Sequence, residues 1–242
     1  MMNNPLEQFE IHKIVEISIF GYDLSFTNSS MVMLIGSILA CGLFAYCVKN
    51  IAIIPSKAQM FGELIYNAIN QTLINSAGAK AQKYIPLIFS LFIFILFCNI
   101  LGLFPHSFAP TSHIAITFSL AIVVFLFITL AGIVKHGFKF FSLFLPAGIP
   151  LWLAPLMIII ELFSYLGKPI SLSLRLAANM VAGHILLEVL AGFMVMLPLV
   201  LKVLPMPLIM ILLVFEFGVA ILQAYIFTIL SCVYLNDTLN LH

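Results

Sequence analysis

The chain has 242 residues, of which 63% are hydrophobic and only 8% are charged, and its net charge at pH 7 is +1. Soluble domains carry ~25% charged residues, so this composition excludes a soluble globular protein and predicts several membrane spans of ~20 residues each. A net charge this close to zero also argues against a nucleic-acid partner.

The first predicted elements are a polar N-terminal segment, residues 1–30, and an apolar membrane helix over residues 31–48. Glu7, Glu10 and Glu16 fall within the polar segment. A signal peptide instead begins with basic residues and continues into an apolar core. We therefore expect insertion into the membrane without a cleaved leader.

The next segment, residues 57–78, differs from a membrane span. Apolar residues recur there every three or four positions and alternate with polar ones, which predicts an amphipathic helix at the membrane surface. Two uniformly apolar stretches, 85–104 and 113–134, follow and predict two further membrane helices. Their many phenylalanines are interpreted as lipid-facing or packing residues.

The last two predicted helices, 151–197 and 206–236, are too long for upright spans. A helix of ~45 residues would be ~68 Å long, whereas the hydrocarbon core is ~30 Å thick. These helices must therefore be steeply tilted or near-horizontal, with a bend near Pro169, and we expect them to form a hairpin. The fold class is an all-α membrane protein: one domain over 1–242, with five membrane helices and one surface helix.

Lysine placement predicts the orientation of the chain. Six of the ten basic residues lie in two loops that fall on one side of the membrane if there are five crossings. By the positive-inside rule this side is the matrix or the cytoplasm, and the C-terminus lies there too. The N-terminus then faces the intermembrane space or the periplasm. The six residues are Lys49, Lys57, Lys80, Lys83, Lys135 and Lys139.

Arg175 is the only arginine of the chain and lies in a long apolar run. A guanidinium keeps its charge at physiological pH, and holding it at membrane depth costs at least ~2.5–3.5 kcal/mol. A turn of ~100° per residue places five polar residues of this helix on one stripe. They are Glu161, Lys168, Ser171, Arg175 and Asn179.

A second polar line faces away from the first. His184 is nine residues after Arg175, which puts it half a turn away and ~13 Å further along the helix axis. Because His and Glu side chains can carry protons, two offset proton paths separated by the fixed charge of Arg175 are indicated. The second line consists of His184, Glu188, Glu216 and Gln223, with Tyr234 at the same angle as the last two.

Each polar residue also has a simpler interpretation. Arg175 and Lys168 could extend toward the headgroups, and Glu161 and Glu216 could be paired acids that only stabilise packing. The amide side chains could serve as hydrogen bonds between helices. The cysteines show no metal-ligand or redox spacing, so no metal site or redox pair is expected. No cofactor and no catalytic residue are assigned.

The residues just described match a known family. The run Ser171-Leu-Ser-Leu-Arg-Leu-Ala-Ala-Asn-Met-Val-Ala-Gly-His184 resembles the hallmark sequence of subunit a (subunit 6) of F-type ATP synthases. Glu216, the run that begins at Gln223, and the C-terminal Tyr234-Leu-Asn-Asp resemble the same family. With His on the first long helix and Glu on the second, the chain is similar to mitochondrial and alphaproteobacterial members.

The resemblance implies specific roles. Arg175 is then the stator arginine that faces the c-subunit ring, with Asn179 one turn away. Glu161 belongs to the half-channel on the matrix or cytoplasmic side. The opposite half-channel contains the remaining matched residues, His184, Glu216 and Gln223.

The implied function is coupling of proton flow to rotation and ATP synthesis in the Fo motor, with no covalent chemistry on this chain. The implied partners are the c-ring with its carboxylate opposite Arg175, the peripheral stalk subunit b, other Fo subunits and lipids. The implied location is the mitochondrial inner membrane, or else the plasma membrane of an alphaproteobacterium. A proton-coupled secondary transporter and a stand-alone proton channel remain as alternatives.

Overall fold

The computed structural model describes residues 12–16, 18–19, 22–23, 25–49, 52–104, 108–144, 153–198, 203 and 205–240, apart from the side chains of residues 18–19, 22–23, 141–144 and 154. Within this part the molecule is almost entirely helical, and five helices are long and apolar enough to cross a membrane. The predicted all-α membrane fold is confirmed.

Short strands form the only non-helical elements among the described residues. Strand β1 (Lys13–Val15) pairs antiparallel with β4 (Phe26–Thr27), and β2 (Ser18–Ile19) pairs antiparallel with β3 (Tyr22–Asp23). This nested hairpin arrangement leads directly into the first helix. The Thr27 hydroxyl accepts a hydrogen bond from the Ser30 backbone N–H and so caps that helix.

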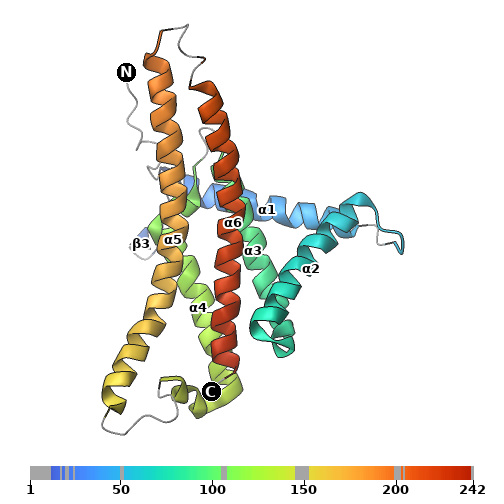
Figure 1. The fold of residues 1–242 in the computed structure, drawn as a ribbon, viewed down its shortest axis with the longest axis vertical. Helices are drawn as coiled ribbons and strands as arrows, with labels where there is room; N and C mark the ends of the chain where they lie inside the picture. The colour runs from blue at the N-terminus through green and yellow to red at the C-terminus, as the bar shows by residue number, and fades with distance from the viewer. Residues whose placement is uncertain are drawn as a thin grey trace.

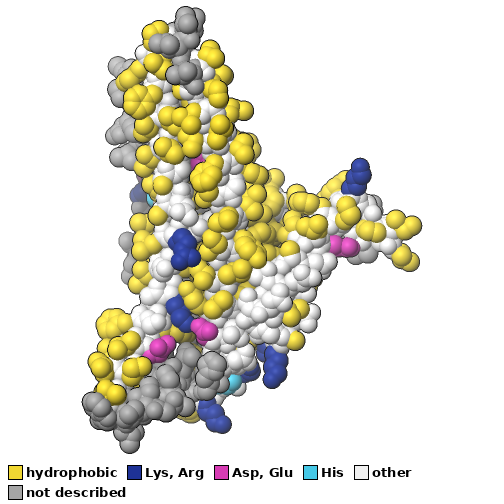
Figure 2. Space-filling model, in the orientation of Figure 1, with side chains coloured by type: hydrophobic (Ala, Val, Ile, Leu, Met, Phe, Trp, Pro, Cys, Tyr) yellow, Lys and Arg dark blue, Asp and Glu magenta, His cyan; other side chains and the backbone are white. Residues whose placement is uncertain are grey.

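Helix α1 (Asn28–Val48) is uniformly apolar, whereas α2 (Lys57–Ala77) is amphipathic. The buried side of α2 includes Ile69 and Leu73, and its polar side chains form the pale stripe along α2 in Figure 2. Helix α2 ends at Gly78, whose φ of 79° lies in the left-handed region that favours glycine. The predicted amphipathic helix is therefore present.

The centre of the molecule is α3 (Ile85–Gly102), which follows the short 3-10 helix η2 (Ala79–Tyr84) and is the most deeply buried of the five apolar helices. Its fully buried Ile88 and Ile95 belong to the main hydrophobic core. The next elements are η3 (Pro110–Ser112), α4 (Ile114–His136) and η4 (Gly137–Phe144).

Helices α5 (Ala154–Met196) and α6 (Met206–Leu239) form a long antiparallel hairpin (Figure 1). They contain 43 and 34 residues, which makes them ~65 Å and ~51 Å long, well beyond the ~30 Å hydrocarbon core. Figure 1 also shows α1 running across the direction of the hairpin, so α1 and the hairpin cannot both stand along the membrane normal.

Only the C-terminal half of α6 is inserted into the helix bundle. From Glu216 onward its buried residues recur every three or four positions, which is the spacing of one helix face. The other end of the hairpin extends past the remaining helices in Figure 1, and its large apolar side chains are exposed. The hairpin therefore offers a long apolar surface to lipid or to another subunit.

Candidate functional site

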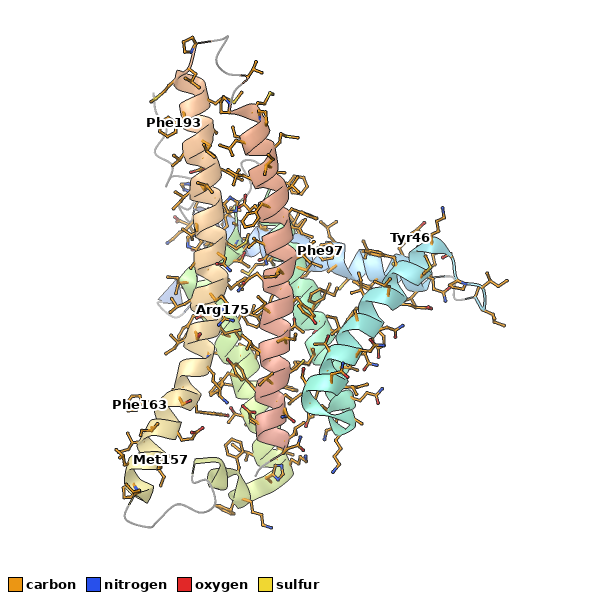
Figure 3. The ribbon with its side chains drawn as sticks, in the orientation of Figure 1. Tyr46, Phe97, Met157, Phe163, Arg175 and Phe193 are labelled. Atoms are coloured by element: carbon orange, nitrogen blue, oxygen red, sulfur yellow. The ribbon has the colours of Figure 1, made fainter. Side chains whose placement is uncertain are left out.

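Arg175 lies near the middle of α5 (Figure 3), and its side chain is exposed. The neighbouring Leu172 and Leu176 are buried against the bundle, whereas Ser171 and Asn179, one turn to either side of Arg175, are also exposed. Arg175 forms no ion pair or hydrogen bond with any residue that the structure describes. Its charge therefore points outward from the bundle.

Asn179 connects this outer stripe to α6. Its Nδ2 donates a hydrogen bond of 2.9 Å to Oε1 of Gln223, which is fully buried. The sequence placed these two residues on separate polar lines, whereas the structure brings them into contact. The reason is that α5 and α6 pack side by side along this stretch, so that facing side chains of the two lines meet.

Glu216 lies seven residues, or about two helical turns, before Gln223 on α6 and is only 5% exposed. Its carboxylate is packed against the backbone of α5 at Gly183, where a Cβ atom would lie 2.6 Å from Oε1 of Glu216. Neither carboxylate oxygen accepts a hydrogen bond from a described residue. Glu216 is thus a buried acid at the interface of the two long helices.

His184 and Glu188 continue along α5 from Gly183, and both side chains are half-buried. Both carboxylate oxygens of Glu188 are enclosed and accept no hydrogen bond within the described part of the chain. The structure therefore places His184, Glu188 and Glu216, which can all exchange protons, along one stretch of the hairpin. Glu216 accepts no hydrogen bond from His184.

Lys168 is the centre of a cluster at the other end of the hairpin. Its Nζ forms a salt bridge of 2.8 Å with Asp237, and it lies 5.0 Å from the ring centroid of Tyr234 and 5.5 Å from that of Tyr165. The Tyr165 hydroxyl shares a hydrogen bond of 2.7 Å with Thr129 of α4. Tyr234 therefore belongs with Lys168 and not with the Glu216 end of α6.

Asp237 was not among the residues that the sequence singled out. The available signal was its position three residues after Tyr234, which puts both side chains on one face of a helix. What the sequence could not show is that Lys168, almost seventy positions earlier, would lie opposite that face.

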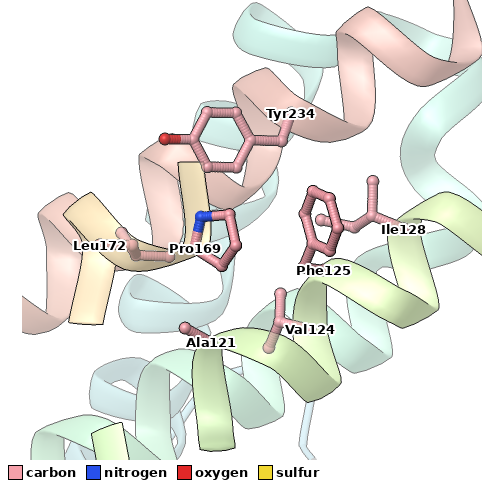
Figure 4. A pocket seen from close by; sticks show the side chains of 7 residues that line it. All are labelled: Ala121, Val124, Phe125, Ile128, Pro169, Leu172 and Tyr234. Carbon is pink, nitrogen blue, oxygen red and sulfur yellow. The ribbon is translucent and has the colours of Figure 1, made fainter. Parts of the chain in front are cut away.

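A bend in α5 lies directly beside the Lys168 cluster. Pro169 has no backbone N–H and cannot complete the helical hydrogen-bond pattern, and α5 turns away from α6 in this region (Figure 1). Figure 4 shows how Pro169 and Tyr234 close over α4. The seven residues around this contact are Ala121, Val124, Phe125, Ile128, Pro169, Leu172 and Tyr234.

Glu161 lies beyond the bend, seven residues before Lys168, and is half-buried. It forms no hydrogen bond or ion pair with the residues that the structure describes. The outer stripe of α5 thus carries a free acid at one end and Arg175 in the middle. Across the described residues, no group of three or more His, Cys, Asp or Glu side chains has the geometry to hold a metal ion.

Comparison with known protein families gives a match over most of the chain. The model of the family described as the ATP synthase A chain matches residues 30–236, from the start of α1 almost to the end of α6. The chain belongs to this family. All of the site residues discussed above except Asp237 fall within the matched range.

Membership establishes the general function. The ATP synthase A chain is a proton-translocating subunit of the Fo sector, and its apolar helices make this chain a multi-pass membrane protein. Its partners are other Fo subunits of the ATP synthase, such as the c-ring. The predicted family, proton transport and role in ATP synthesis are confirmed.

Proposed function

We propose that this A chain is the stator that separates two proton half-channels and presents Arg175 to the c-ring. The observation that carries the proposal is that Arg175 is exposed on the outer side of α5 and forms no ion pair or hydrogen bond with the described residues. A permanent charge at membrane depth needs a counter-charge, and a rotor carboxylate on another subunit would supply it.

The inlet half-channel contains His184, Glu216 and Gln223. The buried Glu216 and the enclosed amide of Gln223 line the α5–α6 interface, and the hydrogen bond between Gln223 and Asn179 leads from it to the outer stripe. A proton passing along these groups would reach the surface one turn from Arg175. There it protonates the rotor carboxylate, and the neutral carboxyl group can then move into lipid as the ring rotates.

The outlet half-channel leads from Arg175 toward Glu161. Arg175 favours the ionised form of an approaching carboxylic acid, so the acid releases its proton on this side. The proton then leaves toward Glu161, with Ser171 and the pair of Lys168 and Asp237 as accessory groups. The same positive charge repels protons and so prevents direct leakage between the two half-channels.

The membrane sidedness follows from the lysine-rich loops. We infer that the C-terminus and the outlet face the mitochondrial matrix, and that the N-terminus and the inlet face the intermembrane space. In an alphaproteobacterium these compartments would be the cytoplasm and the periplasm. The chain folds as a single membrane domain that also contacts the peripheral stalk subunit b.

Replacing Arg175 tests this proposal. In the intact ATP synthase, Arg175→Ala should abolish ATP-driven proton pumping into sealed vesicles, because nothing then ionises the rotor carboxylate or separates the half-channels. A matched control is Leu174→Ala, which shortens the adjacent exposed side chain and should leave pumping near normal. Coupled pumping at the normal rate by Arg175→Ala would refute the stator role.

A further inference from the structure

A cavity of about 390 Å³ lies between α1, α2 and α3, away from the α5–α6 hairpin. Its volume falls within the ~300–1,000 Å³ range of ligand pockets. The side chains that line it are mostly apolar, with one acid among them. The lining residues are Phe44, Cys47, Val48, Gln59, Gly62, Glu63, Tyr66 and Phe89.

Three aromatic rings form one part of the lining. Phe89 packs edge-to-face against Phe44 at a centroid distance of 5.0 Å and against Tyr66 at 5.6 Å. The three rings come from three different helices and hold one another in place. Aromatic rings that line a cavity can bind a quaternary ammonium ion over their faces, because the ring faces carry partial negative charge.

Glu63 is the acid of the cavity, and it is held in position. Gln59 is buried and its Nε2 donates a hydrogen bond of 2.7 Å to Oε1 of Glu63. The same amide exchanges hydrogen bonds with the backbone of Ala52, which fixes the loop before α2. No Lys, Arg or His of the described residues forms an ion pair with Glu63, so its negative charge is available to a ligand.

The exposed side chains beside the cavity indicate that it lies at the depth of lipid headgroups. The loop between α1 and α2 exposes Ile53 and Ile54 almost completely, at 103% and 87%, and the exposed Lys49 and Lys57 flank it. Apolar side chains between snorkelling lysines are typical of the membrane interface. Figure 2 shows this arm of the molecule, where α1 and α2 meet, with hydrophobic, basic and acidic side chains close together.

We propose that this cavity binds the headgroup of a choline lipid, such as phosphatidylcholine. The trimethylammonium group lies against Phe44, Tyr66 and Phe89, with Glu63 as its counter-charge. The acyl chains follow the exposed apolar side of α1. This site is separate from the proton path and does not depend on the role of Arg175.

Hydrogen-bond capacity explains the preference for a quaternary over a primary ammonium. A primary ammonium carries N–H donors that each need an acceptor, whereas a trimethylammonium group has none. In this cavity both polar atoms of Gln59 are already engaged, which leaves few acceptors besides Glu63. A primary ammonium would therefore give up more hydrogen bonds to water than the cavity returns, whereas a trimethylammonium group has none to give up.

Helices α1 and α2 are in close contact at one side of the cavity. A Cβ atom at Gly62 would lie 3.0 Å from Cβ of Cys47, so the two helices touch at this glycine. Beyond this contact they diverge toward the rings and Glu63. The cavity is therefore built by the packing of α1 on α2 and is present without a ligand.

Photolabelling of the intact ATP synthase tests the proposal. The complex is placed in vesicles of phosphatidylethanolamine and phosphatidylglycerol with a trace of phosphatidylcholine that carries a diazirine near its headgroup. Adducts are located by mass spectrometry. We expect adducts within residues 44–66, and at least about three-fold less labelling in Glu63→Gln and in Tyr66→Leu. Asn67→Leu, on the adjacent exposed position of α2, is the matched control and should label normally.

Competition on the unchanged chain gives a second readout that needs no variant. In vesicles of phosphatidylglycerol with the same labelled tracer, added unlabelled phosphatidylcholine should suppress the adducts at a lower mole fraction than added phosphatidylethanolamine does. Equal suppression by both lipids would overturn the choline preference. An absence of adducts at residues 44–66, or full labelling of both cavity variants, would overturn the site itself.

Discussion

Gly183 is the residue at which α5 comes into contact with the buried acid of α6. A Cβ atom there would lie 2.6 Å from Oε1 and 3.0 Å from Cδ of Glu216. Any larger residue must therefore move the whole carboxyl group. The residue beside His184 is small because the carboxylate of Glu216 occupies the space that a side chain would fill.

Gly183→Ala should lower ATP-driven proton pumping several-fold, because Glu216 is displaced from the inlet path. The amount of assembled complex should stay near normal, since alanine favours a helix over glycine by about 1 kcal/mol. The matched control is Gly192→Ala in the same helix, where a Cβ atom meets nothing within 4 Å. Equal pumping by the two variants would mean that the position of Glu216 does not limit proton flow.

Helical geometry alone predicted a good part of the residue arrangement. It placed Ser171, Arg175 and Asn179 on one stripe, and all three are exposed on α5. It could not predict the hydrogen bond between Asn179 and Gln223. That contact depends on how far α5 slides along α6, which no periodicity within one helix reveals.

At the scale of the element, the bend of α5 sets the direction of the outlet end. Pro169 interrupts the hydrogen bonds of the helix, and the segment before it diverges from α6, while Lys168 at the bend itself contacts Asp237 and Tyr234 on α6. The salt bridge of Lys168 with Asp237 then joins the two helices at this point. Pro169 is therefore the residue that gives the outlet its shape.

Pro169→Ala should straighten α5 and so move Lys168 out of the 2.8 Å contact with Asp237 that the bent helix allows. An interior proline costs a helix about 3 kcal/mol, so alanine restores a regular helix at this position. The contact can be measured with a zero-length carbodiimide, which couples Lys168 to Asp237 only when the amine and the carboxyl group touch. We expect a much lower yield of this cross-link and slower proton pumping.

Pro207→Ala is the control, because a proline in the first turn of a helix such as α6 removes no hydrogen bond. An unchanged cross-link yield in Pro169→Ala would show that packing against α4, and not the proline, determines the bend.

The secondary-structure elements differ in how clearly the sequence predicts them. The amphipathic period predicted α2, and length alone predicted that α5 and α6 tilt. The strands before α1 were missed because two or three residues are too few for an alternating pattern. The aromatic cavity was missed because Phe44 and Phe89 are indistinguishable in the sequence from lipid-facing phenylalanines.

At the scale of the whole molecule, one part of the helix bundle forms the buried core and another part remains exposed for contact with a partner. Helix α3 and the C-terminal half of α6 form the buried centre, while the outer side of α5 stays exposed along its length. Because the ATP synthase A chain acts with other Fo subunits, this exposed side is the surface that we assign to the c-ring.

Disulfide cross-linking of the intact enzyme tests this assignment most directly. Ala177 is 1% exposed and Ala178, about 100° away around the helix, is exposed, so the two positions lie on the buried and the exposed side of α5. Each is replaced by cysteine and paired with a cysteine placed next to the rotor carboxylate of the c subunit. The account predicts a cross-link from Ala178→Cys and none from Ala177→Cys. Cross-linking from Ala177→Cys alone, or from neither position, would contradict it.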